Sequence, residues 1–256
     1  MPGFQYLQFL LVFLIIPTTI LLLLNKRQKK DSFHNSTSFK PVLIVIALAV
    51  IYTTPWDNYM IQKGVWSYGK DVFTLSIFYA PLEEYMFFVL QPLLTGIFFY
   101  SFLSGKNLKE AKLNIKKGLI GLVSGASVSV LGLLFLRTDP TFYTGSILLW
   151  AGPILAVQWV GWPILAQNYR TLLKGVLIPT AYLSFADMYA IHQGIWSISG
   201  EFTTGLHIFN LPVEEALFFL ITNIFIVQTL ILYQFCTESD EISFSRILGG
   251  VGEWRN

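Results

Sequence analysis

The sequence predicts an all-α integral membrane protein whose seven transmembrane helices form two parallel three-helix repeats, joined by one linker helix. Three observations support this fold class. Of the 256 residues, 54% are apolar and only 12% are charged, about half the charged share of a soluble domain. Seven stretches are long and apolar enough to cross a bilayer, and two parts of the chain repeat each other. With a mean hydropathy of +0.59, the composition excludes a disordered chain and argues against a water-soluble globule.

A transmembrane helix needs about 20 mostly apolar residues, because each residue adds ~1.5 Å toward a hydrocarbon core of ~30 Å. The predicted spans are residues 4–24, 41–57, 79–103, 118–136, 145–166, 171–187 and 208–233. The first is too long, and has too little positive charge before it, for a cleaved signal peptide. Pro55 and Pro179 fall in the second and sixth spans, whose ends the sequence therefore defines less sharply.

The distribution of positive charge supports this count of spans. Fourteen of the 17 Lys and Arg residues fall in four segments on one side, namely 25–40, 104–117, 167–174 and the tail after 233. The positive-inside rule assigns that side to the cytoplasm. We therefore expect a multi-pass protein of the cell membrane with an outside N-terminus and a cytoplasmic C-terminus. The net charge of +2 is too small to indicate a nucleic-acid partner, and the single cysteine, Cys236, excludes an internal disulfide.

Two segments occur twice in the chain, at offsets of about 130 residues. Residues 57–67 (DNYMIQKGVWS) match residues 187–197 (DMYAIHQGIWS), and residues 78–88 (FYAPLEEYMFF) match residues 209–219 (FNLPVEEALFF). Chance similarity between two apolar helices would match Leu to Ile, whereas these segments share Asp, Gly, Trp, Pro and paired Glu. The chain is therefore expected to contain a duplication.

The duplication explains the odd number of spans. Two three-span units joined by a short loop would face opposite ways, and the helix at 118–136 restores a parallel arrangement about a pseudo-twofold axis along the membrane normal. Gly118, Gly121 and Gly125 in this helix favour close contact with a neighbouring helix. The expected organisation is a first repeat at 1–104, a linker at 105–140, a second repeat at 141–235 and a cytoplasmic tail at 236–256.

Each repeat carries two adjacent glutamates at the start of its last span. One interpretation is helix-end chemistry, because Pro81 and Pro212 suit a first helical position and acidic groups are favoured beside the positive end of the helix dipole. That interpretation does not explain a repeated pair. An ionisable group within a span is costly and is by default a functional candidate. The candidate catalytic residues are Glu83, Glu84, Glu214 and Glu215.

Helical spacing places aromatic rings beside these carboxyl groups. Glu83 and Phe87 are i, i+4 neighbours, and so are Glu84 and Phe88, so each carboxyl group shares a face with a ring. Loss of hydration among rings favours the neutral acid, which can then donate a proton. Aromatic faces stabilise a nearby cation. This combination suits acid-initiated chemistry on an alkene.

The remaining repeated residues are open to two interpretations. Asp57 and Asp187, expected just outside the second and sixth spans, could support the glutamates or be ordinary interfacial residues. Trp66 and Trp196 could line the site, although an aromatic belt at the membrane interface is the favoured interpretation for them and for their neighbours Tyr59 and Tyr189. Gly64 and Gly194 are expected to permit a turn. His192 and His207 are not repeated, and no metal site is predicted.

The repeated Pro-x-Glu-Glu-x-x-Phe-Phe motif, in a duplicated three-span unit with one extra span, resembles the membrane-embedded lycopene cyclases, which occur as two subunits or as one fused chain. The resemblance covers residues from about 4 to 235. It implies an isomerase that closes β-ionone rings at the ends of linear lycopene: a carboxyl group protonates the terminal double bond, the ring closes, and the resulting cation loses a proton. The implied site residues are Pro81, Glu83, Glu84, Phe87, Phe88, Pro212, Glu214, Glu215, Phe218 and Phe219, with Glu83 and Glu214 as the first candidates for the acid.

The resemblance implies a linear carotenoid substrate in the bilayer and no cofactor, and the sequence contains neither nucleotide-binding fingerprint. It leaves open whether the protein forms a homo-oligomer or associates with other carotenoid enzymes. A retinal protein is excluded because the last span, 208–233, has no Lys for a Schiff base. A small proton-coupled transporter remains the alternative, since buried Glu residues in repeated units also suit a proton relay.

Overall fold

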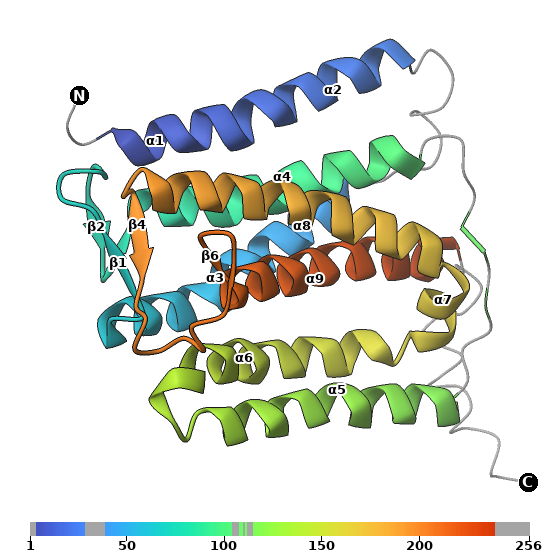
Figure 1. Ribbon diagram of the computed structural model, residues 1–256. Coiled ribbons are helices and arrows are strands. Elements are labelled where there is room, and N and C mark those ends of the chain that lie inside the picture. Colours follow the sequence, from blue (N-terminus) through green and yellow to red (C-terminus); the bar gives the residue numbers. More distant parts are fainter. Residues whose placement is uncertain (1–3, 29–38, 104–107, 110, 112–114, 239–256) are drawn as a thin grey trace, which may run out of the picture.

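The computed structural model describes residues 4–28, 39–103, 108, 109, 111 and 115–238. Its long helices lie side by side, and its short strands gather at the end where α1 begins (Figure 1). The helices of this part of the chain are α1 (Gln5–Leu10), η1 (Leu11–Ile15), α2 (Ile16–Gln28), α3 (Lys40–Lys63), α4 (Leu82–Leu103), α5 (Ile115–Phe135), η2 (Asp139–Thr141), α6 (Phe142–Trp159), α7 (Trp162–Gln167), α8 (Tyr169–His192) and α9 (Val213–Glu238). The helix α1 runs on through the π-helical turn η1 into α2.

Six helices in the described residues are long and apolar enough to cross a membrane. They cover Gln5–Asn25, Lys40–Lys63, Leu82–Leu103, Lys116–Phe135, Asp139–Trp159 and Val213–Phe235. The predicted span at 171–187 corresponds to α8, which has 24 residues but carries Arg170, Lys174, Asp187 and His192 and is less apolar than the other six. The six spans identify a membrane protein and account for six of the seven predicted crossings.

Several predicted boundaries were wrong. The second and sixth spans were expected to end at 57 and 187, but α3 and α8 continue to Lys63 and His192. Pro55 and Pro179 lie inside these helices, because a proline removes only one backbone hydrogen bond and a helix can continue past it. Asp57 and Asp187 are therefore within helices and buried. The predicted span 145–166 is two helices, α6 and α7, with a break at Gly161.

Turns and short strands connect α3 to α4 and α8 to α9. Gly64 ends α3 in the left-handed conformation, with φ +81°, and Gly194 follows α8 with φ +68°, so the predicted turns at these glycines are confirmed. The strands are β1 (Trp66–Tyr68), β2 (Ser76–Ile77), β3 (Ala80–Pro81), β4 (Trp196–Ile198), β5 (His207–Ile208) and β6 (Leu211–Pro212). The β2–β3 hairpin leads directly into α4, and the β5–β6 hairpin leads into α9.

Residues at equivalent positions of the two sequence repeats meet each other. β1 and β4 pair antiparallel with Ser67 opposite Ser197, and the two hydroxyl oxygens are 2.8 Å apart. Deeper in the bundle, Gln91 on α4 donates to the Thr222 hydroxyl on α9 at 3.0 Å, and these positions are also equivalent. The two repeats therefore contact each other through matching residues at two levels.

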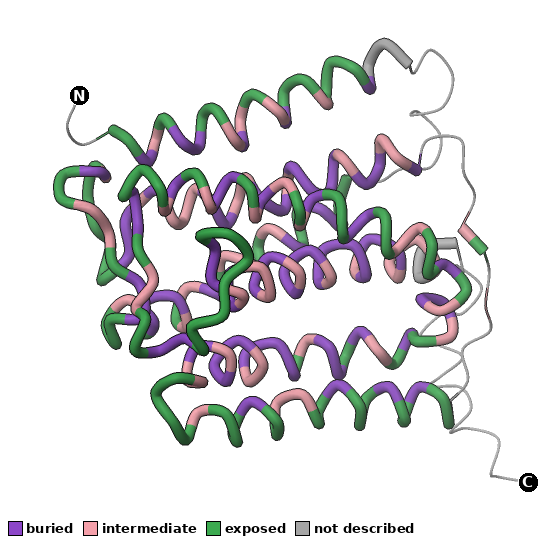
Figure 2. Tube along the Cα trace, viewed as in Figure 1, coloured by how far each residue is buried: buried purple, intermediate pink, exposed green. Residues whose placement is uncertain are grey.

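The buried core lies between α4 and α9, whereas α1–α2 and α5 expose most of their surface (Figure 2). The exposed side chains of these outer helices are largely Leu, Ile and Val, such as Leu23, Ile120 and Val123. Continuous apolar faces of this extent suit the hydrocarbon of a bilayer.

Close packing of α5 on α6 depends on glycine, as the sequence predicts for residues 118, 121 and 125. A Cβ atom at Gly121 would overlap the Trp159 backbone, and one at Gly125 would overlap the backbone of Ala156. Because backbone cannot move aside as a side chain can, these two glycines set the distance between the helices.

We expect Gly125→Leu to lower the free energy of unfolding of the detergent-solubilised protein by about 1–3 kcal/mol, because the added side chain pushes α5 away from α6. Gly200→Ala is the matched control, since a Cβ atom there meets no atom within 4 Å. Thermal unfolding followed by circular dichroism measures both. Equal stability of the two variants would contradict the role given to Gly125.

Candidate functional site

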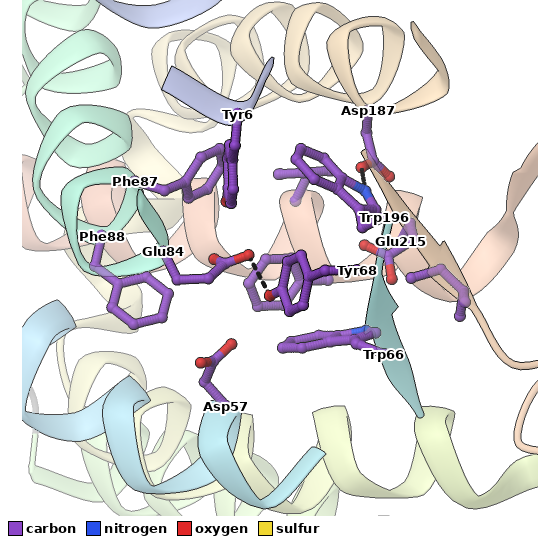
Figure 3. A pocket seen from close by; sticks show the side chains of 13 residues that line it. Tyr6, Asp57, Trp66, Tyr68, Glu84, Phe87, Phe88, Asp187, Trp196 and Glu215 are labelled. Atoms are coloured by element: carbon purple, nitrogen blue, oxygen red, sulfur yellow. Dashed lines mark hydrogen bonds between the residues drawn. The ribbon is translucent and has the colours of Figure 1, made fainter. Parts of the chain in front are cut away.

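A cavity of about 50 Å³ lies at the strand end of the bundle and is lined by side chains from both repeats. Its lining comes from α1, α3, α4, α8, α9 and the paired strands β1 and β4 (Figure 3). The residues are Tyr6, Asp57, Trp66, Tyr68, Glu84, Phe87, Phe88, Asp187, Trp196, Ile198, Glu215, Phe218 and Phe219. The cavity thus collects most of the residues that the sequence repeat singled out.

Four carboxyl groups line this cavity, two from each repeat. Asp57 comes from α3 and Glu84 from α4, while Asp187 and Glu215 come from the equivalent positions of α8 and α9. Each hairpin ends at a proline, and the next residue is the first of α4 or α9. Each Glu pair therefore falls in the first turn of its helix. There the helix dipole favours negative charge. Adjacent residues point about 100° apart, so only one glutamate of each pair can face the cavity.

The glutamates that face the cavity are Glu84 and Glu215, and each accepts a hydrogen bond from a tyrosine. The Tyr68 hydroxyl donates to Glu84 Oε1 at 2.6 Å, and the Tyr143 hydroxyl donates to Glu215 Oε1 at 2.8 Å. Tyr6 reaches into the cavity from α1 toward Glu84 (Figure 3). Burial of the Tyr68 ring, together with the negative charge of nearby Glu84, raises the pKa of its hydroxyl well above the ordinary value. Tyr68 therefore keeps its proton and acts as a donor.

The two aspartates differ in their surroundings. Asp187 Oδ1 accepts a hydrogen bond of 2.7 Å from the Trp196 indole nitrogen. Asp57, which is only 1% exposed, has no hydrogen-bond partner at either carboxyl oxygen among the described residues, although it lies across the cavity from Glu84 (Figure 3). The repeats thus supply equivalent carboxyl groups but hold them differently.

Aromatic rings form most of the wall around these groups. Tyr6 and Trp196 have ring centroids 5.0 Å apart, and Phe87 and Phe219, from the two repeats, lie 6.3 Å apart. The aromatic-belt interpretation favoured for Trp66 and Trp196 was wrong, because both indoles are buried against the cavity. The pairing of β1 with β4 turns both indoles toward the cavity. Residues 66 and 196 are far apart in the sequence, so the positions of the predicted spans do not indicate this pairing.

Glu83 and Glu214 lie outside this cavity and hold the loops that precede the hairpins. Glu83 Oε1 accepts bonds of 2.9 Å from both the backbone nitrogen and the hydroxyl of Thr74. Glu214 Oε1 accepts from the same two groups of Thr204, at 2.8 and 2.7 Å. Pro81 in β3 pairs with Ser76 in β2, and Pro212 in β6 pairs with His207 in β5. Neither proline lines the cavity. The first glutamate of each pair thus holds the loop before its own helix, through Thr74 in the first repeat and Thr204 in the second.

Sequence reasoning missed three tyrosines of the site, Tyr6, Tyr68 and Tyr143. Tyr68 has Ile198 at its equivalent position, so the repeat did not mark it. Tyr6 and Tyr143 occupy equivalent places in the structure. The Tyr6 backbone nitrogen donates to the Val72 carbonyl, and the Tyr143 backbone nitrogen donates to the Phe202 carbonyl, both at 3.0 Å. Val72 and Phe202 are equivalent positions of the two repeats. The sequences around these two tyrosines are too different to align, so no signal in the chain identified them.

Carboxyl groups with phenol and indole donors, inside an aromatic enclosure, can move a proton and stabilise a cation. Among the described residues, no three His, Cys, Asp or Glu side chains are placed to hold a metal ion. His192 and His207 are exposed and lie outside the cavity.

Relatives of the chain are known. It is 44% identical over 191 residues to the lycopene beta-cyclase of Halobacterium salinarum, an alignment that covers 74% of this chain and 80% of the relative. It is 34% identical over 242 residues to a bifunctional lycopene cyclase/phytoene synthase of Leptosphaeria maculans, and 30% identical over 256 residues to that of Arthroderma gypseum. Each alignment covers 88% of this chain but 40% of the fungal protein. No family model matches the chain, and no solved structure matches it.

We expect Glu214→Ala to destabilise the protein by about 1–3 kcal/mol, because the Thr204 backbone nitrogen and hydroxyl lose the buried acceptor that holds this loop. Glu201→Ala, in the same loop but exposed, is the control and should leave stability unchanged. Thermal unfolding in detergent compares the two. A Glu214→Ala variant as stable as the control would show that the loop contact contributes nothing.

Proposed function

The chain belongs to the lycopene cyclase family, and from this premise we propose that it converts the linear ends of lycopene into β-ionone rings within the membrane. The observation that carries the proposal is the convergence of four carboxyl groups from both repeats on one aromatic cavity. An isomerase of this kind needs a proton donor, a proton acceptor and a place where a carbocation survives. The relatives give no support to a transporter, the alternative that the glutamate pairs also fit.

The location of the site suits the substrate. Lycopene is a hydrocarbon without a polar group, so it dissolves in the bilayer and binds through apolar surface alone. Phenylalanines from both repeats and the two tryptophans supply such surface around the carboxyl groups. Water would trap a carbocation as an alcohol, and an aromatic wall limits its entry.

We assign the proton donor to Asp57. A carboxylate buried without any donor is far costlier than the neutral acid, and both oxygens of Asp57 lack partners among the described residues. Glu84, which accepts a hydrogen bond from Tyr68, is better suited to carry negative charge. These surroundings support Asp57 as acid and Glu84 as base.

The proposed reaction balances without a redox partner. The Asp57 proton adds to the terminal double bond, the cation is attacked by the next double bond, and the ring-forming carbon–carbon bond closes. Glu84 removes a proton from the carbon beside the new cation, which leaves a ring double bond. Transfer of that proton from Glu84 to Asp57 restores the starting state. The faces of Phe87 and Trp66 stabilise the cation meanwhile.

Asp187 and Glu215, the equivalent groups of the second repeat, are proposed to stabilise the cation rather than to form a second acid–base pair. The Trp196 and Tyr143 donors to them favour charge on both groups, so we expect them to support the cation more than to donate the proton. The resulting proposal is one cavity with two unequal halves.

We further propose the seven-span topology, with repeats at 1–104 and 141–235, a linker at 105–140, an outside N-terminus and a cytoplasmic C-terminus. The helix α8 packs against α9 and α4, which supports it as a seventh crossing. The three of the 17 Lys and Arg residues that are not in the four cytoplasmic segments are Lys63, Lys70 and Arg137. They lie at or beyond the helix ends on the strand side. Most of the tail 236–256, apart from the end of α9, lies outside the described residues.

Expression of the chain in cells that accumulate lycopene should produce cyclic carotenes, because the substrate reaches the site through the shared membrane. Chromatography of the extracted pigments identifies the products, and an immunoblot of the membrane fraction confirms expression. Unchanged lycopene in cells that contain the folded protein would overturn the proposed function.

In the same cells, we expect Asp57→Asn and Glu84→Gln each to lower cyclisation by about 100-fold or more, because each removes a proton-transfer group. Glu83→Gln should stay within a few-fold of the wild type, since an amide oxygen still accepts from Thr74. The measurement is the ratio of cyclic carotene to lycopene at matched protein level. Full activity in both cavity variants would refute the assigned acid–base pair.

A further inference from the structure

A second hollow, which we call the α3–α6 groove, lies next to the carboxyl cavity. It has a volume of about 80 Å³. Its walls are α3, with Ala49 and Tyr52, and α6, with Trp150 and Ile154, and α9 contributes Phe225 to its floor. The groove is separate from the carboxyl groups and has no role in the proton transfers proposed above.

The groove and the cavity share part of their lining. Phe87, Phe88 and Phe218, from the last helix of each repeat, line both spaces, so the two spaces meet at these aromatic side chains. A molecule with one end at Glu84 that continued past these rings would enter the groove. This continuity relates the groove to the substrate site.

The groove extends along the bundle away from the carboxyl groups. On α9 its lining runs from Phe218 to Thr229, about 16 Å at 1.5 Å per helical residue. Such a length is suited to a stretch of extended chain rather than to a compact ligand. A linear carotenoid is longer, so its far end would continue into the lipid.

The groove also opens toward the bilayer. Leu48, at its α3 wall, is 55% exposed, on a helix surface that the lipid would cover. A hydrocarbon dissolved in the membrane could therefore move into the groove sideways without crossing water.

Most polar groups along the groove are paired within the protein. The Tyr52 hydroxyl donates to the Trp150 carbonyl at 2.8 Å, and Gln158 Nε2 donates to the Phe225 carbonyl at 2.8 Å. The exceptions are Gln158 Oε1, at the far end, and the Trp150 indole nitrogen, which have no partner among the described residues. A lining whose polar atoms are largely satisfied favours an occupant that makes no hydrogen bonds.

We propose that the α3–α6 groove binds the polyene chain of the substrate while the linear end lies among the carboxyl groups. The proposal rests on the proposed cyclase function and adds to it a second subsite, which recognises chain length rather than the reacting end. It assigns Ala49 and Ile154 to chain binding and gives them no part in proton transfer.

The test fills the groove and compares two substrates of different length. Ala49→Leu and Ala49→Trp narrow it from α3, and Ile154→Trp narrows it from α6. Ile51→Trp is the matched control, because this residue is on α3 but 72% exposed and absent from the groove lining. Membranes containing each variant receive lycopene or a short acyclic polyene that has the same end group but too little further chain to reach Ala49.

We expect the groove variants to cyclise lycopene at least about tenfold more slowly, with a larger loss for Trp than for Leu at position 49, because the chain loses its site. The short polyene should be cyclised at the wild-type rate, and Ile51→Trp should change neither reaction. The expected signature is thus a change in the ratio of the two rates, which misfolded protein would not produce.

Equal loss on both substrates in all groove variants, or unchanged cyclisation of lycopene, would overturn the groove proposal. Failure of the wild type to cyclise either substrate would instead overturn the proposed function. The two failures are therefore distinguishable in one set of assays.

Discussion

The gathering of four carboxyl groups at one aromatic cavity, with Asp57, Asp187 and Glu215 buried and Glu84 partly buried, is the constraint on which the structure of the site depends. Acidic groups withdrawn from water need donors, neutralisation or both. Here the donors are phenols and an indole, from Tyr68, Tyr143 and Trp196. These donors are neutral, so they do not fix the carboxyl groups as charged partners of a tight ion pair, which suits the proposed acid–base role.

The repeat supplies this enclosure because neither unit closes it alone. The paired strands β1 and β4 bring Trp66 and Trp196 to the same cavity from opposite sides, and Phe87 of one repeat faces Phe219 of the other. Polar contacts between α4 and α9, such as that from Gln91 to Thr222, hold the two last helices together below it. The chemistry of the site is thus a property of the contact between the repeats.

Much of this arrangement was accessible from the sequence, and the exceptions have physical reasons. Apolar length predicted the spans, and glycine spacing predicted the α5–α6 contact. The motif predicted both glutamates of each pair as site residues. Which of the two faces the cavity depends on how α4 and α9 are rotated about their own axes, and the hairpins that precede these helices set that rotation. Asp57 was expected just outside the second span because the apolar stretch ends there, whereas α3 continues to Lys63. Tyr6 lies outside the segments that repeat in the sequence, and only its contact with Val72 shows its correspondence to Tyr143.

The hydrogen bond between Ser67 and Ser197 joins the same residue of two copies of one motif. A contact of this kind is self-complementary, the type of interface by which two identical subunits associate. A single three-helix ancestor could therefore have assembled as a homodimer by pairing its one strand, the counterpart of both β1 and β4, with the same strand of a second copy. A single chain allows the two copies to differ, as Tyr68 and Ile198 do at equivalent positions of the cavity lining, whereas a symmetric homodimer would place the same residue on both sides.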